Sequence, residues 1–141
     1  MQQEKHKENL INKTMENYSH PLYYLEDSLP MRAAITDQLR RQGINNIAQG
    51  GNLSDLEKYL AEGKIAQAYL FDGNFPEKLG GRVELNAFLA VDRVRTLDRN
   101  AKIAILSSDD SLKSSVEGIG IKFFHKRTIE PKDIADWLKQ S

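Results

Sequence analysis

Short apolar runs alternate with stretches of helical periodicity five times between Leu22 and Ser141, and this alternation limits the fold more than any other feature. Most of the apolar runs are continuous, which is typical of strands that are buried on both faces of a sheet. Helices between such strands cover the two faces, so the sequence predicts an α/β fold with a doubly wound, five-stranded parallel sheet. The expected strands are Leu22–Leu25, Ile44–Ala48, Ala66–Phe71, Ile103–Leu106 and Lys122–His125.

Helix signals stand between these strands. Apolar residues recur at helical spacing over residues 31–39, between Ser28, which can cap the helix, and Gly43, which can end it. A capping box that begins at Ser54 predicts a second helix. The other expected helices are Val83–Leu97, a short helix running to about Glu117, and a last helix that is capped by Thr128 and carries Ile134, Trp137 and Leu138.

The composition indicates one neutral domain. The chain has 141 residues, of which 40% are hydrophobic, enough for a single substantial core. Its 20 basic and 20 acidic side chains cancel, so no net field attracts nucleic acid or a membrane surface. Cysteine is absent, which excludes disulfides and thiol chemistry and fits a reducing compartment. With no long apolar segment and no signal peptide, we expect a soluble, cytoplasmic protein.

The first twenty residues differ from the rest. Residues 1–20 are polar, and only Leu10, Ile11 and Met15 form a weak apolar stripe. We expect residues 1–20 to be a polar N-terminal extension, either flexible or a loosely docked helix, and residues 21–141 to be the folded domain.

Polar residues follow the carboxyl ends of four of the expected strands, and these ends meet at one edge of a parallel sheet. Three carboxylates gathered there would repel one another by about 4 kcal/mol per pair at 4 Å, with an effective dielectric constant near 20. A cation would relieve this repulsion, and the oxygen ligands suit Mg²⁺ better than zinc or copper. The residues concerned are Glu26, Asp27, Asp72, Asn74, Ser107, Ser108 and Lys126.

This ordered set resembles the active-site pattern of the receiver domains of bacterial two-component response regulators. The matching residues are Glu26-Asp27, Asp72-x-Asn74-x-Pro76, Ser107 and Lys126. The resemblance implies a receiver domain over residues 21–141, with a flavodoxin-like (βα)5 fold and strand order 2-1-3-4-5. It also implies a phosphorylation-controlled signalling switch rather than an enzyme, because such a domain catalyses only its own phosphorylation and dephosphorylation.

The resemblance assigns the metal and the phosphoryl acceptor. Asp72 would accept a phosphoryl group from a sensor histidine kinase or a phosphotransfer protein. Mg²⁺ would be bound directly by Asp27, Asp72 and the backbone carbonyl of Asn74, and by Glu26 through water.

The remaining roles concern the response to phosphorylation. Lys126 would hold a phosphoryl oxygen, and Ser107 would hydrogen-bond to the phosphoryl group so that Phe123 can turn inward. The output would be binding to a downstream protein, without direct contact with nucleic acid or membrane; homodimerisation is left open.

The sequence departs from the family pattern in three places. Arg127 stands where the family usually has a proline after a cis peptide bond, and a cis bond before another residue costs about 2.5–4 kcal/mol, so the geometry of Lys126–Arg127 is left open. The short segment between Ser107 and Lys126 predicts a trimmed fourth helix. The long segment between Asp72 and Ser107 predicts an extended third helix.

Plain structural interpretations also exist for these residues. They are a turn at Asp72-Gly73, a favoured helix start at Glu26-Asp27, a cap at Ser107, a surface lysine at Lys126 and a core aromatic at Phe123. Alternative functions are a degenerate receiver that binds partners without phosphorylation, and a phosphatase of the haloacid-dehalogenase class with an aspartate nucleophile. The phosphatase class needs an acid at the position of Asn74, and a flavodoxin needs a phosphate cradle that this sequence lacks.

Overall fold

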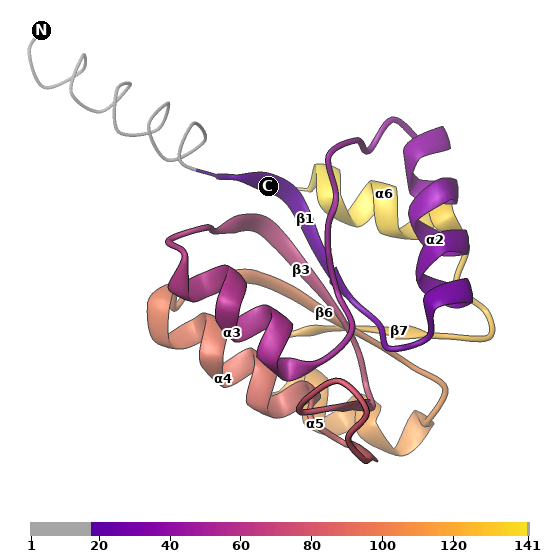
Figure 1. The fold of residues 1–141 in the computed structure, drawn as a ribbon. Helices are drawn as coiled ribbons and strands as arrows, with labels where there is room; N and C mark the ends of the chain where they lie inside the picture. The colour runs from indigo at the N-terminus through magenta and orange to yellow at the C-terminus, as the bar shows by residue number, and fades with distance from the viewer. Residues whose placement is uncertain (1–17, 141) are drawn as a thin grey trace, which may run out of the picture.

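The computed structural model describes residues 18–140 of the chain. Five parallel strands form one sheet in the order β2-β1-β3-β6-β7, which corresponds to the predicted order 2-1-3-4-5 along the chain (Figure 1). The predicted α/β fold is therefore confirmed. The strands are β1 (His20–Leu25), β2 (Ala48–Gly50), β3 (Ala66–Asp72), β6 (Lys102–Ser107) and β7 (Lys122–His125).

Helices cover both faces of the sheet (Figure 1). On one face, α2 (Leu29–Arg41) and α6 (Pro131–Lys139) enclose a core with Leu22 and Tyr24 of β1. On the other face, Tyr23 and Leu25 point into a second core. That core is covered by α3 (Leu53–Ala61), α4 (Ala87–Leu97) and α5 (Lys113–Gly118), with the 3₁₀ turn η1 (Asp110–Leu112) directly before α5.

Helix α2 begins and ends as predicted, whereas two other caps differ. The Ser28 hydroxyl accepts a hydrogen bond from the Met31 N–H at 3.3 Å, and Gly43 adopts a φ of +89° after the helix. Helix α3 is capped by Asn52, whose side chain accepts from the Asp55 N–H at 2.8 Å, so the predicted capping box at Ser54 is wrong. Helix α6 is not capped by Thr128. Pro131 fixes its first turn, and its capping box pairs Glu130 with Asp133.

Strand β2 starts later than the predicted strand Ile44–Ala48. The Ile44 N–H is already bonded to the Leu39 carbonyl at 3.0 Å, so Ile44 closes the end of α2. Asn46 then has a φ of +60°, a left-handed conformation that interrupts an extended strand. Pairing with β1 therefore begins only at Ala48.

The long segment after β3 forms a hairpin instead of the predicted extension of the third helix. Strand β4 (Phe75–Pro76) pairs antiparallel with β5 (Val83–Glu84), and α4 begins only at Ala87. The side-chain amide of Asn86 donates to the buried Phe75 carbonyl at 2.7 Å, which joins the start of α4 to the hairpin. The hairpin also accepts a bond from the Ser54 N–H at the Glu77 carbonyl, 2.8 Å away.

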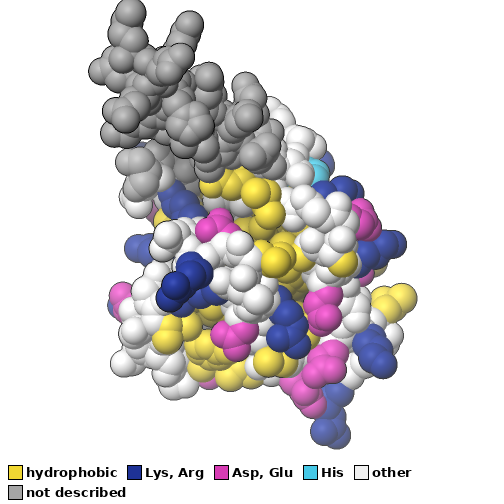
Figure 2. Space-filling view, turned by 90° about the vertical axis from the view of Figure 1, so that its left-hand side faces the viewer, with side chains coloured by type: hydrophobic (Ala, Val, Ile, Leu, Met, Phe, Trp, Pro, Cys, Tyr) yellow, Lys and Arg dark blue, Asp and Glu magenta, His cyan; other side chains and the backbone are white. Residues whose placement is uncertain are grey.

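The predicted trimming of the fourth helix is confirmed, because α5 has only 6 residues. Of the predicted N-terminal extension, residues 1–17 lie outside the described residues, and His20 already belongs to β1. None of the helices formed by residues 18–140 has the length and apolar character needed to cross a membrane. On the α3 and α4 side, acidic and basic side chains are interspersed among small apolar patches (Figure 2).

Candidate functional site

The carboxyl ends of four strands bring the predicted site residues to one edge of the sheet. Glu26 and Asp27 come directly after β1, Asp72 is the last residue of β3, Ser107 ends β6, and Lys126 follows β7. The register aligns these ends, because Leu25 pairs with Phe71, Asp72 with Leu106, and Ser107 with His125. The parallel sheet thus gathers side chains that are up to a hundred residues apart in the sequence.

Three carboxylates meet at this edge. One oxygen each from Glu26, Asp27 and Asp72 lies within 4.8 Å of the other two. Glu26 is only 1% exposed and Asp72 only 7%, whereas Asp27 is open to solvent. Carboxylates this close and this buried are costly unless cations or protons compensate them.

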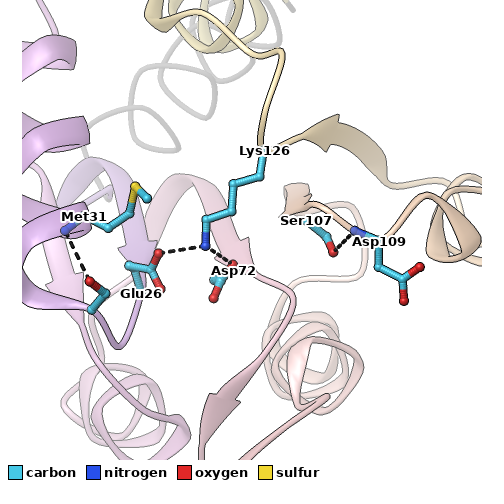
Figure 3. Close-up of polar contacts among 7 residues, drawn as sticks. Glu26, Met31, Asp72, Ser107, Asp109 and Lys126 are labelled. Atoms are coloured by element: carbon cyan, nitrogen blue, oxygen red, sulfur yellow. Dashed lines mark hydrogen bonds and ion pairs between the residues drawn. The ribbon is translucent and has the colours of Figure 1, made fainter.

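Lys126 supplies one compensating charge. Its Nζ lies 3.0 Å from Asp72 Oδ1 and 3.1 Å from Glu26 Oε1, and its side chain extends from the loop after β7 down between the two acids (Figure 3). Every peptide bond between residues 18 and 140 is trans, including the bond between Lys126 and Arg127. The lysine therefore reaches the acids without the cis bond that the family pattern usually has. Its own backbone N–H donates to the Ser107 carbonyl at 2.9 Å.

The electrostatics show that the charge at this site is only partly balanced. Burial raises the pKa of Glu26, and the negative charge of Asp72 raises it further. Burial and the neighbouring Glu26 likewise raise the pKa of Asp27. Burial alone would lower the pKa of Lys126, but its ion pairs with Asp72 and Glu26 outweigh this and raise it. One ammonium against three carboxylates leaves a formal charge of −2 when all are ionised, which one divalent cation would neutralise.

The donor set fits Mg²⁺, because carboxylate oxygens are the ligands that this ion prefers. Two of the three acids are buried in rigid positions after strands, and Asp27 is accessible to an ion that enters from solvent. Asn74 lies in the turn between β3 and β4 with its side chain exposed. Its predicted role as a ligand through the backbone carbonyl stays a prediction.

Ser107 lies beside the phosphoacceptor candidate. A Cβ atom added at Gly73, the residue after Asp72, would be only 3.2 Å from Ser107 Oγ, so the serine packs directly against this turn. Ser107 is 3% exposed, and its Oγ accepts a hydrogen bond from the Asp109 N–H at 3.0 Å (Figure 3). Ser108 is exposed, which supports the choice of Ser107 over its neighbour.

Phe123 points into the core on the α3–α5 side and is 9% exposed. The ring is therefore turned inward in this structure, as a core aromatic would be. Its predicted role as a switch stays a prediction.

The sequence analysis gave no role to His125 and Asp110, which the fold brings together next to Lys126. His125 Nε2 lies 3.2 Å from Asp110 Oδ1, and His125 Nδ1 accepts from the Arg127 N–H at 3.1 Å. No spacing rule connects these residues, because Asp110 follows β6 and His125 ends β7. The only signal in the sequence was a histidine directly before Lys126, a predicted site residue.

The chain matches no protein-family model and no curated protein. It does match solved structures. The Salmonella typhimurium response regulator RcsB aligns with 85% of this chain at a TM-score of 0.66 and 15% identity. The chain spans 57% of that RcsB chain.

Two further matches cover most of both chains. A chain of the CheX–CheY–BeF3–Mg²⁺ complex from Borrelia burgdorferi aligns at a TM-score of 0.65 and 15% identity, over 83% of this chain and 84% of that one. A response regulator receiver protein from Sinorhizobium medicae aligns at a TM-score of 0.68 and 12% identity, over 84% of this chain and 90% of that one. At such identities the likeness concerns the fold, and together with the strand order it establishes that this chain has the fold of response-regulator receiver domains.

Proposed function

We propose that this protein is a phosphorylation-controlled signalling switch that accepts a phosphoryl group on Asp72. The observation that carries the proposal is the position of Lys126 Nζ, which contacts both Asp72 and Glu26 within a group of three carboxylates. An acidic cluster alone has many explanations. A lysine held against a carboxylate oxygen of a strand-end aspartate is an arrangement suited to phosphoryl transfer, in which positioning and charge neutralisation supply most of the catalysis.

In the reaction, a carboxylate oxygen of Asp72 attacks phosphorus and forms the new O–P bond. The bond from phosphorus to the leaving atom of the donor breaks, and the leaving atom keeps the electron pair and takes up a proton. The Lys126 ammonium exchanges part of its contact with Asp72 for a phosphoryl oxygen. The Ser107 hydroxyl, which accepts from the Asp109 N–H in this structure, would donate to another phosphoryl oxygen.

Asp27, Asp72 and Glu26 would hold Mg²⁺ at this site. When bound, the ion supplies positive charge against the carboxylates and the incoming phosphoryl oxygens. The donor would be a sensor histidine kinase or a phosphotransfer protein, and the output would be altered binding of a protein target. The matched complex that pairs CheX with CheY is an example of a receiver-fold protein bound to a protein partner.

Mass spectrometry after incubation with acetyl phosphate and Mg²⁺ tests this proposal. We expect the mass of one added phosphoryl group on the wild-type protein and none on Asp72→Asn. Asp37→Asn serves as the matched control, because Asp37 is an exposed carboxylate on α2 and pairs with Arg41. A wild-type protein that stays unmodified, or an Asp72→Asn protein that is still modified, would contradict the proposal.

A second candidate is a receiver-fold module that binds partners without phosphorylation. The short helix α5 favours it, because this helix flanks β7 at the edge of the sheet. Binding to a partner that is unchanged by Asp72→Ala would support this candidate over the first. The phosphatase alternative gains no support, since the side-chain amide of Asn74 is too weak an acid to transfer a proton as a general acid.

A further inference from the structure

The loop that carries Lys126 is held by His125. Both nitrogens of the His125 ring have a polar neighbour: Nδ1 accepts a hydrogen bond from the Arg127 N–H at 3.1 Å, and Nε2 lies 3.2 Å from Asp110 Oδ1. Because a backbone N–H is always a donor, Nδ1 must be the unprotonated nitrogen, and Nε2 then carries a proton on the side of the ring that faces Asp110. The ring thus connects the loop after β7 to the turn η1 after β6.

Two main-chain hydrogen bonds also close the turn that follows His125. The His125 carbonyl accepts from the Thr128 N–H at 3.2 Å and from the Ile129 N–H at 3.0 Å. The His125 ring is the side chain that fixes the direction of the Arg127 N–H, at the peptide unit where the family pattern has proline. A lysine side chain is flexible, so the orientation of the Lys126 backbone decides which acids its ammonium can reach.

We propose that His125 is a positioning residue that aims Lys126 at Asp72. This inference rests on the proposed function and names one more residue for the same site. The ring takes over the role of a rigid element after Lys126, and Asp110 keeps the ring oriented. Asp110 is 79% exposed at its side chain, so its pairing with His125 contributes little stability by itself. Its effect is on the orientation of the imidazole.

A positioning role differs from a general structural role in its dependence on Lys126. The first measurement is the affinity for beryllofluoride at saturating Mg²⁺, followed through amide signals, in the wild type, His125→Ala, Lys126→Ala and the double variant. We expect His125→Ala to weaken beryllofluoride binding about tenfold in the wild-type background. In the Lys126→Ala background it should cause no further loss, because the two residues act as one unit. Equal losses in both backgrounds would overturn the inference.

One conservative variant tests the bond between the His125 ring and the Arg127 N–H by itself. His125→Asn keeps an acceptor near the position of Nδ1 and should restore most of the beryllofluoride affinity that His125→Ala loses. Thr128→Ala is the control in the same loop, since its exposed side chain makes no hydrogen bond within residues 18–140, and it should leave the affinity unchanged. If His125→Asn binds no better than His125→Ala, the bond to the Arg127 N–H is not the cause and the proposal fails.

A second measurement needs no phosphoryl mimic. The side-chain carbon signal next to Nζ of Lys126, assigned by its loss in Lys126→Ala, reports the contact with Asp72 in the ligand-free protein. His125→Ala should move this signal toward those of exposed lysines such as Lys132. An unmoved signal would overturn the positioning role. If the Lys126 signal moves in His125→Ala but the wild-type protein binds no beryllofluoride, the positioning role is supported and the proposed function is contradicted.

Discussion

Lys126 Nζ lies 3.0 Å from Asp72 Oδ1 although the peptide bond that follows Lys126 is trans. The two residues are 54 positions apart in the sequence, and the adjacent ends of β3, β6 and β7 bring them together. The ammonium therefore contacts the carboxylate that we propose as the phosphoryl acceptor. This arrangement is electrostatically unfavourable for Glu26 and Asp72, because their carboxylates are buried next to each other.

Adding Mg²⁺ should stabilise the folded protein. An ion that binds only the folded state at a concentration a hundredfold above its dissociation constant adds about 2.7 kcal/mol to the free energy of unfolding. Thermal unfolding with Mg²⁺ and with a chelator measures the shift. Asp27→Asn should reduce the Mg²⁺-dependent rise in melting temperature, whereas Asp37→Asn should not. A rise of the same size in Asp27→Asn would contradict the assignment of Asp27 as a ligand.

Lys126→Ala should destabilise the protein when Mg²⁺ is absent, by about 1–3 kcal/mol, because it removes a charged partner from two buried carboxylates. Urea unfolding in a chelator measures this loss. Lys132→Ala, which changes an exposed lysine of α6, should be close to neutral. Mg²⁺ should restore part of the deficit of Lys126→Ala. An equal deficit with and without the ion would show that the lysine and the metal do not compensate the same acids.

Stability should fall as the pH drops through the range in which His20 takes up a proton. Burial lowers the pKa of His20 below 6.5, and Lys64 lowers it further, while Nδ1 lies 2.8 Å from the Tyr59 hydroxyl. The unfolded chain therefore binds this proton more readily than the folded protein, and acidification below about pH 6.5 favours unfolding. Urea unfolding between about pH 7.5 and pH 5 should show this slope. His20→Gln should flatten it, and an unchanged slope would rule out His20 as its source.

Asn86→Ala should loosen the β4–β5 hairpin. The side-chain amide of Asn86 is buried and donates to the Phe75 carbonyl at 2.7 Å, so its removal deletes a buried hydrogen bond between the start of α4 and the hairpin. We expect a loss of about 1–3 kcal/mol in the free energy of unfolding, together with faster amide exchange in residues 75–84. Asn100→Ala, at an exposed position, is the control. A loss no greater than that of the control would show that the hairpin does not depend on this bond.

The strands and the acidic site could be predicted because each signal is local. Continuous apolar runs marked β3, β6 and β7 to within one residue, and each acid stands directly after such a run. Where two local signals competed, the prediction was wrong. Asn52 and Ser54 are both good caps, and the chain uses Asn52, which comes first after β2. Val83 fits a helical stripe, but its partner Pro76 holds it in a hairpin.

The contacts of His125 could not be predicted for a different reason. Asp110 and His125 are brought together by the parallel pairing of β6 with β7, and that pairing is defined only by the folded sheet. A pattern search sees a lone histidine without metal spacing. Only the folded sheet shows that its ring bridges two loops of the site.

The hairpin after Asp72 makes the two sides of the site unequal in stiffness. Glu77 at its base is bonded to the first turn of α3, and Phe75 is bonded to the residue that begins α4, so the main chain following Asp72 is anchored at two helices. On the opposite side, the loops after β6 and β7 are joined by one main-chain bond, from the Lys126 N–H to the Ser107 carbonyl, and by the contact between His125 and Asp110. We therefore expect the response to the proposed phosphorylation of Asp72 in the loops before α5 and after β7 rather than in the hairpin.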